Sequence, residues 1–228
     1  MDYKRYAIYF TPPPGPFADF GAGWLGWDPA TGQRPPAPDI AGLPAAREDI
    51  TATPRKYGLH ATIKPPFRLA DGQSVDALNG ALRDLCGQLD TIRLDGLDCA
   101  ALGRFLALVP CGDTTALDTL AARVVRDLDR FRAPPSEAEL TRRRAGGLSP
   151  SQEGLLIQWG YPYVMDEFRF HITLTGKLPK AQTAAVQGIL EPRISPLLPR
   201  PFVIDALSLM GEDDKGFFHL IHRHALSG

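Results

Sequence analysis

Two stretches of the chain alternate apolar and polar residues with the period of a β-strand. They span residues 57–64 and 168–175, and in each the apolar positions fall on one face, which predicts a strand with one buried side. The polar face of the first strand would carry Gly58, His60, Thr62 and Lys64, and that of the second Arg169, His171, Thr173 and Thr175. The pattern therefore predicts two strands that each present a histidine and a threonine two positions apart.

The same succession of predicted elements follows both strands. After the first come a helical stretch at about 75–89 and apolar runs at 92–94 and 105–109, and after the second come a helical stretch at about 181–190 and apolar runs at 202–204 and 217–221. This order indicates an internal repeat, with units at about 57–110 and 168–223, that is too long and too few in number for a solenoid. We expect two related lobes that face each other across a cleft, each with one His-x-Thr strand.

Three further segments complete the predicted fold. The apolar run at 5–10 predicts a buried strand at the centre of one lobe. The Pro- and Gly-rich segment 11–46 contains Trp24 and Trp27, which favour packing on a lobe, although a lid over the cleft stays open as an alternative. Helical spacing and capping serines at about 114–160 predict a helical connector between the repeat units. The prediction for 1–228 is one two-lobed α+β domain, with pseudo-twofold duplicated antiparallel β-sheets, helices packed outside and a central cleft.

Composition and charge restrict the expected partners. The 228 residues are 44% hydrophobic and 22% charged, and the formal net charge of −1 gives no global attraction to DNA or to a membrane, so any anion site must be local. The densest charge run, the three arginines at 142–144, is interpreted as a solvated helix end rather than a nucleic-acid patch. The chain contains no apolar run of about 18 residues and no signal-peptide pattern, so we expect a cytoplasmic protein.

The cysteines and the C-terminal histidines do not predict a metal site. The three cysteines lack a CxxC spacing. On a strand His222 and His224 would share a face with His219 opposite, and no carboxylate or cysteine stands at a helpful spacing beside them. We therefore predict no metal and no other cofactor.

Paired histidines suit a reaction that removes one proton and delivers another, because imidazole titrates near neutral pH. A phosphodiester is a suitable substrate, since a neutral imidazole can deprotonate the attacking water or hydroxyl while an imidazolium protonates the departing alkoxide. The hydroxyls of Thr62 and Thr173 would donate to the non-bridging oxygens. The residues predicted to bind substrate beside them are Tyr57, Lys64, Arg169, Lys177 and Arg55. Which histidine is the acid and which is the base stays open.

Several sequence segments resemble a known family. They are RYAIYF at 5–10, WLG at 24–26, YGLHATIKPPF at 57–67 and FHITLTG at 170–176. Together they resemble the 2H phosphoesterase superfamily, and within it a branch of uncharacterised proteins associated with bacterial phosphonate-degradation gene clusters. The resemblance implies that His60 and His171 form the acid/base pair, that Thr62 and Thr173 bind phosphate, and that no metal takes part.

The sequence therefore predicts a metal-independent phosphoesterase that acts on a cyclic phosphodiester of a nucleotide or of a phosphorylated ribose. Its expected partner is a small-molecule or nucleotide phosphate ester, with an RNA end as a further option. Two alternatives stay open. One is a non-catalytic binder that holds a phosphorylated ligand or RNA end between the same histidines. The other is a 2′-5′ RNA ligase, to which the near-neutral charge gives little support.

Overall fold

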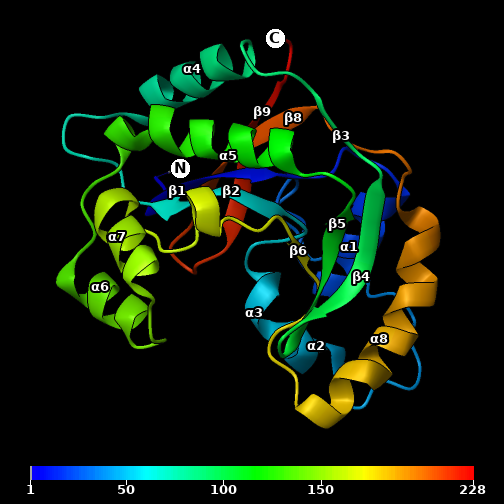
Figure 1. The fold of residues 1–228 in the computed structure, drawn as a ribbon. Helices are drawn as coiled ribbons and strands as arrows, with labels where there is room; N and C mark the ends of the chain where they lie inside the picture. Colours follow the sequence, from blue (N-terminus) through cyan, green and yellow to red (C-terminus); the bar gives the residue numbers. More distant parts are fainter. Residues whose placement is uncertain (1) are drawn as a thin grey trace.

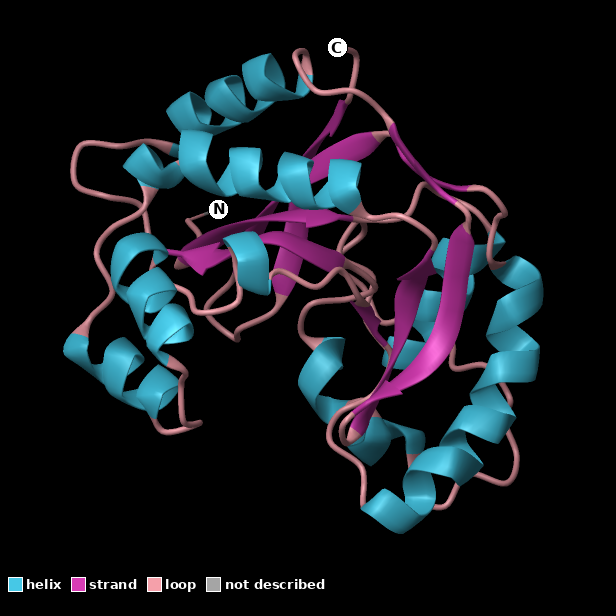
Figure 2. Cartoon of the chain, in the orientation of Figure 1, coloured by secondary structure: helices cyan, strands magenta, loops and turns pink. Residues whose placement is uncertain are grey.

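The computed structural model describes residues 2–228, and a seven-stranded antiparallel sheet in the order β4-β5-β6-β2-β1-β8-β9 runs through its centre (Figure 1). A second sheet pairs β3 with β7. The strands are β1 Arg5–Phe10, β2 Ala61–Phe67, β3 Ile92–Leu94, β4 Gly96–Leu102, β5 Phe105–Cys111, β6 Ile172–Thr173, β7 Phe202–Ile204, β8 Ala206–Glu212 and β9 Phe218–Ala225. The predicted α+β class with antiparallel strands is confirmed, and the helices lie outside the strands (Figure 2).

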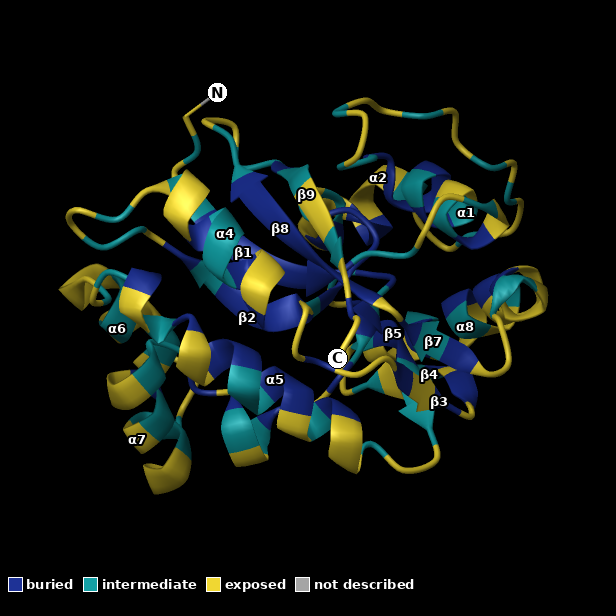
Figure 3. Cartoon of the chain, turned by 90° about the horizontal axis from the view of Figure 1, so that it is seen from above, coloured by how far each residue is buried: buried dark blue, intermediate teal, exposed yellow. Residues whose placement is uncertain are grey.

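The α-helices are α1 Pro16–Leu25, α2 Arg47–Ile50, α3 Ala52–Arg55, α4 Val75–Cys86, α5 Thr115–Asp127, α6 Glu137–Arg144, α7 Pro150–Trp159 and α8 Lys180–Ile194. Short 3₁₀ turns lie at η1 Asp129–Phe131, η2 Met165–Glu167 and η3 Ser195–Leu197. The inner faces of α4 and α5 are buried against the sheet and their outer faces are exposed, as amphipathic helices require (Figure 3). No helix within residues 2–228 is long and apolar enough to cross a membrane.

The internal repeat is visible in the order of the elements. The succession β2-α4-β3-β4-β5 recurs as β6-α8-β7-β8-β9, and β3 pairs with its counterpart β7. The two units exchange their last strands, because α4 packs on β8 and β9 whereas α8 packs on β4 and β5. Each half of the sheet therefore contains parts of both units rather than one unit each. The predicted repeat had only two strands after each helix, whereas the structure has three, so the sequence pattern missed β4 and β8.

Strand β1 is buried on both faces, as expected of a central strand. Ile8 and Phe10 point into the main core, whereas Ala7 and Tyr9 belong to a smaller cluster on the opposite side with Phe218. This second face carries the candidate site, so the side chain of Tyr9 lies directly beneath it.

The second predicted strand is much shorter than the alternation suggested. Only Ile172–Thr173 pairs as a strand, and the eight-residue prediction for 168–175 is wrong in its length. The backbone N–H groups of Leu174 and Thr175 both donate to the carbonyl of Leu106, which turns the chain out of the ladder. The Thr175 hydroxyl accepts from the N–H of Leu106 and donates to the carbonyl of Gly176, so it does not face a ligand. The alternating apolar side chains are nevertheless all buried, as predicted: Phe168, Phe170, Ile172 and Leu174.

The Pro- and Gly-rich segment 11–46 packs on the protein, in agreement with the favoured interpretation. It contains α1, and both indoles are buried. Trp24 donates from Nε1 to the carbonyl of Leu174 at 2.8 Å, and Trp27 donates to that of Phe218 at 2.8 Å. The two tryptophans therefore tie this segment to both halves of the sheet.

The predicted connector is helical throughout most of its length. Helix α5 lies against β2, while α6 and α7 stand beside that half of the molecule (Figure 1). Both α6 and α7 begin with a capping box, formed by Ser136 with Glu139 and by Ser149 with Gln152. These local signals explain why the helix starts were predictable.

Candidate active site

The register between β2 and β6 brings the two His-x-Thr motifs together. Ala61 pairs with Ile172 in an antiparallel ladder, so one residue further on each side His60 lies opposite Thr173 and Thr62 lies opposite His171. Directly opposed side chains are about 5 Å apart at Cβ, and diagonal neighbours are about 7–8 Å apart. The two histidines occupy one such diagonal, related by a local pseudo-twofold axis through the Ala61–Ile172 pair. This spacing suits a single phosphate group that touches both.

His60 is almost fully buried between two tyrosines. Its ring centroid lies 4.1 Å from that of Tyr9 and 5.5 Å from that of Tyr57. Its Nδ1 donates to the carbonyl of Gly58 at 3.0 Å, which leaves the Nε2 lone pair 3.3 Å from the Thr62 hydroxyl. Burial lowers the pKa of His60 to about 4, partly opposed by the Gly58 carbonyl and reinforced by nearby His171. His60 is therefore neutral at pH 7, with Nε2 free to accept a proton.

Gly58 holds the carbonyl that orients His60. Its φ of 70° is in the left-handed region that favours glycine, and a Cβ there would lie 2.2 Å from the ring of Pro29. A glycine is thus required at this turn on both conformational and steric grounds.

His171 repeats the geometry of His60 in a more open setting. Its Nδ1 donates to the carbonyl of Arg169, also two residues earlier, at 2.8 Å. The ring is half-buried, with Phe105 at 5.9 Å between centroids. Because Nδ1 is occupied, Nε2 is the nitrogen left for a ligand.

A groove of about 210 Å³ lies over the buried histidine. Four residues predicted for the site line it or its edge: Tyr57, His60, Thr62 and Thr173. Among the lining residues that were not predicted for the site are Arg5, Tyr9, Arg143 and Tyr161. They come from β1 and from the connector, which are remote in sequence from both motifs.

The hydroxyl of Tyr9 is buried and has no hydrogen-bond partner within residues 2–228. Leaving such a group unpaired costs on the order of 1–3 kcal/mol, so a donor or acceptor that reaches it gains that much. Burial raises the pKa of Tyr9 well above its ordinary value, which keeps the phenol protonated. Tyr9 pairs with Thr62 across β1 and β2, so the strand phase of 5–10 was the signal that could have placed it at the site.

Lys64 does not face the groove, and its predicted role there is wrong. The ladder pairs Tyr9 with Thr62 but Ile8 with Lys64, so β2 contains a bulge that puts residues 63 and 64 on the same, inner side. The ammonium group donates to the carbonyl of Val125 at 3.0 Å and lies 3.3 Å from a carboxylate oxygen of Asp129. Burial lowers the pKa of Lys64 to about 8, with Asp129 opposing the shift. Its role is to fasten α5 to the sheet.

The other predicted cations also lie outside the groove lining. Arg169 folds back and donates to the carbonyls of Asp166 and Phe168. Arg55 donates to the carbonyls of Leu25 and Glu48, which joins α1 to α3, and Lys177 is exposed beyond β6. Backbone carbonyls outside the groove therefore accept the hydrogen bonds of both guanidinium groups.

Two other arginines reach the groove instead. Arg5 is held by Glu212, whose Oε1 accepts from Nη2 at 2.8 Å. Arg143, on α6, lies with its guanidinium carbon 4.5 Å from the ring centroid of Tyr161. The three arginines at 142–144 do form the last turn of α6, as interpreted, and Arg144 makes a surface ion pair with Glu153, but Arg143 also lines the groove.

No group of three or more His, Cys, Asp or Glu side chains in the described part of the chain is arranged to hold a metal ion. The C-terminal histidines have separate partners, because His219 bonds Asp213 at 3.0 Å and His224 bonds Asn79 at 2.8 Å. All three C-terminal histidines lie on β9, and none of them lines the groove.

Comparison with known proteins places this site in a family. Residues 62–219 match the family described as "Protein of unknown function (DUF1045)". The chain belongs to this family. The DUF1045 match starts at Thr62 and includes the whole second motif, so it covers six of the twelve residues that line the groove and begins just after His60.

The DUF1045 chain is also similar to two curated proteins that are both named "Ribose 1,5-bisphosphate phosphokinase PhnN". It is 38% identical over 218 residues to the one from Janthinobacterium sp. (strain Marseille), covering 93% of this chain and 48% of that protein. It is 36% identical over 213 residues to the one from Laribacter hongkongensis (strain HLHK9), covering 93% and 49%. The chain thus spans about half the length of these relatives.

Among solved structures, the chain is similar over its full length to a crystal structure described as a phosphoesterase, with a TM-score of 0.42 and 18% identity. It is likewise similar to E. coli LigT complexed with 3′-AMP, with a TM-score of 0.43 and 16% identity, again over 100% of both chains.

Proposed function

We propose that this DUF1045 protein is a phosphoesterase of the 2H type that opens a cyclic phosphodiester without a metal ion. The observation that carries the proposal is the diagonal placement of His60 and His171 across β2 and β6. Each histidine has Nδ1 bound to a backbone carbonyl, so both offer Nε2 on the same face. Two proton-transfer groups about one phosphate apart are what in-line displacement at phosphorus requires.

The different surroundings of the histidines support different roles. His60 is neutral at pH 7 and accepts a proton from the attacking water, whereas the more exposed His171 carries a proton to the departing oxygen. Water oxygen bonds to phosphorus, the P–O bond to the ring oxygen breaks, and the products are a phosphomonoester and a free hydroxyl. Proton exchange with solvent then restores both imidazoles.

The threonines and Tyr9 supply hydrogen bonds to the phosphate. Thr62 and Thr173 stand opposite the histidines and donate to the non-bridging oxygens as negative charge builds up there. The unpartnered hydroxyl of Tyr9 gains a partner when the groove is filled. Arg143 adds positive charge from the rim.

A phosphorylated ribose is the substrate class that we favour. The curated relatives carry a name that refers to ribose 1,5-bisphosphate, and this chain matches about half of each. Opening a 1,2-cyclic phosphate of ribose 5-phosphate at the bond to O2 would give a product of that class. A nucleoside 2′,3′-cyclic phosphate presents the same five-membered ring and is the second substrate to test.

One observation favours a different function, a non-catalytic phosphate binder. A general base works best with a pKa near the operating pH, and the pKa of His60 is about 4. Such a group retains its hydrogen-bonding role even if it is too weakly basic for rapid turnover. Turnover therefore decides between the two functions.

The test is turnover of these two cyclic phosphates in the presence of EDTA, followed by ³¹P NMR. We expect conversion to phosphomonoesters by the wild type, unchanged by the chelator. Phosphate-induced thermal stabilisation without any turnover would instead establish the binder. Activity that is lost on chelation and restored by a divalent ion would contradict the metal-free mechanism.

A further inference from the structure

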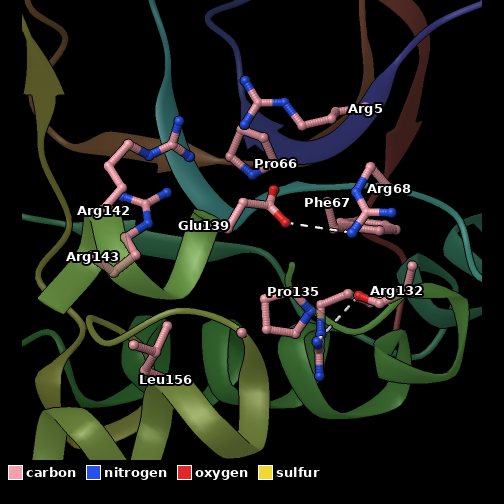
Figure 4. Close-up of a pocket in the computed structure, with 12 residues that line it drawn as sticks. Arg5, Pro66, Phe67, Arg68, Arg132, Pro135, Glu139, Arg142, Arg143 and Leu156 are labelled. Atoms are coloured by element: carbon pink, nitrogen blue, oxygen red, sulfur yellow. Dashed lines mark hydrogen bonds and ion pairs between the residues drawn. The ribbon is translucent and has the colours of Figure 1, made fainter. Parts of the chain in front are cut away.

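A second pocket lies beside the groove and is lined by arginines from four separate segments. They are Arg5 of β1, Arg68 just beyond β2, Arg132 after η1, and Arg142 and Arg143 of α6. Figure 4 shows these side chains around Pro66 and Glu139. Arg5, Pro66 and Arg143 line both the pocket and the groove, so the two cavities share a wall.

The arginines of this pocket outnumber the carboxylates that neutralise them. Asp129 accepts from Arg132 at 2.8 and 3.0 Å, Glu212 holds Arg5, and Glu139 lies 3.4 Å from Arg68. Arg142 and Arg143 have no carboxylate partner within residues 2–228. Within the part of the chain that the structure describes, two guanidinium groups of the pocket are therefore without a carboxylate partner, beside three others whose positions are held by ion pairs.

The size of the pocket matches a phosphate group. Its volume is about 30 Å³. A water molecule needs roughly 10–15 Å³ on this measure, so the pocket accommodates two to three oxygen-sized groups, as many as the free oxygens of a phosphomonoester.

We propose that this arginine pocket binds a second, terminal phosphate of the substrate whose cyclic phosphate lies in the groove. This inference rests on the proposed function and specifies its substrate as a small sugar phosphate that carries a phosphomonoester beside the cyclic diester. A monoester dianion matches two unneutralised guanidinium groups better than an internal RNA phosphate, which has one charge. The protein's net charge of −1 also argues against a long RNA track.

The arrangement separates anchored arginines from a free one. Arg132 also donates to the carbonyl of Gln158, and Arg68 to that of Pro134, so these side chains form a preorganised rim. Arg142 is exposed, lines the pocket but not the groove, and has no hydrogen bond to another described residue. It is the residue whose removal tests phosphate binding with least effect on the fold.

The experiment measures binding of two probes by calorimetry at constant ionic strength. The probes are adenosine 3′,5′-bisphosphate and adenosine 3′-monophosphate. The wild type should bind the bisphosphate at least about tenfold more tightly, since charge-assisted hydrogen bonds to the second phosphate form only there. Arg142→Gln should lose most of this gain, the pair Arg68→Gln with Arg142→Gln should lose all of it, and affinity for the monophosphate should stay unchanged.

Arg193→Gln, an exposed arginine on α8, is the matched control and should keep the full gain. Phosphate binding by the arginine pocket would be contradicted if the wild type bound both probes equally well. It would also be contradicted if the double variant still bound the bisphosphate more tightly than the monophosphate. A 3′-phosphorylated dinucleotide whose second phosphate is an internal diester should show no gain. An equal gain with it would replace the small sugar phosphate by an RNA segment and so overturn the proposed substrate.

The two measurements distinguish failure of the catalytic proposal from failure of the arginine-pocket proposal. If no cyclic phosphate is opened but the bisphosphate gain is present, the catalytic proposal falls and the pocket stands. If cyclic phosphates are opened, the 5′-phosphorylated form of a nucleoside 2′,3′-cyclic phosphate should have at least about a tenfold higher kcat/KM than the unphosphorylated form. Arg142→Gln should then remove most of this preference, through a higher KM for the 5′-phosphorylated substrate. Turnover of the wild type without any such preference would overturn phosphate binding by the pocket and leave the catalytic proposal standing.

Discussion

The two His-x-Thr motifs share one local geometry but differ in their surroundings. In both, Nδ1 of the histidine donates to the carbonyl two residues earlier, at 3.0 Å for His60 and 2.8 Å for His171. His60 lies between two tyrosines beneath the groove, whereas His171 is half-exposed beside Phe105. A duplicated motif therefore becomes chemically asymmetric through its neighbours, because burial is the main cause that lowers the pKa of His60 and keeps it a proton acceptor.

The largest expected effect comes from removing either histidine. His60→Ala and His171→Ala should each lower turnover of a cyclic phosphate by about 10² to 10⁴, the usual contribution of a positioned acid or base. The double variant should lose less than the product of the single losses, because both groups act in one proton-transfer cycle. Steady-state rates at pH 7 measure this, and His222→Ala, on β9 outside the groove, is the control. Wild-type activity in either single variant would contradict the assignment of His60 and His171 as an acid/base pair.

The buried setting of His60 should also appear in the pH dependence of stability. Between its ordinary pKa of 6.5 and its folded value of about 4, the unfolded chain binds a proton that the folded chain does not. The contribution of neutral His60 to the free energy of unfolding is fully present above pH 6.5. It is lost as the pH falls from 6.5 to about 4, so the free energy of unfolding is lower by about 3 kcal/mol at the lower end of this range.

Urea unfolding at a series of pH values measures this loss. His60→Asn should remove most of it, leaving the smaller contribution of His224, whose pKa burial also lowers. A variant that keeps the steep wild-type dependence would show that His60 is not the buried titrating group.

Gly58 and Arg169 are equivalent positions that should respond differently to the same change. Gly58→Ala should destabilise the protein by about 1–3 kcal/mol, because φ is 70° there and the new Cβ meets Pro29. It should also lower activity, since the carbonyl that orients His60 must move. Arg169→Ala keeps its carbonyl and should be within about 0.5 kcal/mol of wild type in thermal or urea unfolding. Similar losses in both variants would mean that the left-handed turn is not what positions His60.

The smallest effect is expected at Tyr9, and its sign is informative. Tyr9→Phe removes a buried hydroxyl without a partner, so the free protein should gain up to about 1 kcal/mol in stability. The same variant should bind phosphate or turn over substrate less well, by about three- to tenfold. Calorimetry with inorganic phosphate and a melting curve measure both, and a loss of stability together with unchanged binding would remove Tyr9 from the site.

The local pattern of the sequence predicted many of the elements, although not β4 and β8, and it singled out the two His-x-Thr motifs. Alternation placed His60 and Thr62, and His171 and Thr173, on one face each, and the repeat of elements around them is present in the structure. The helices of the connector begin where their capping serines stand. These features depend on interactions within a few residues, which is why they could be predicted.

Tertiary structure decided the rest. A bulge in β2 turned Lys64 inward, and strand pairing between distant segments brought Tyr9 and Arg143 to the groove and joined each hairpin to the helix of the other unit. The unequal burial of the two histidines has the same origin. Strand register, bulges and burial depend on partners far away along the chain, and an alternating pattern alone carries no record of which partners those are.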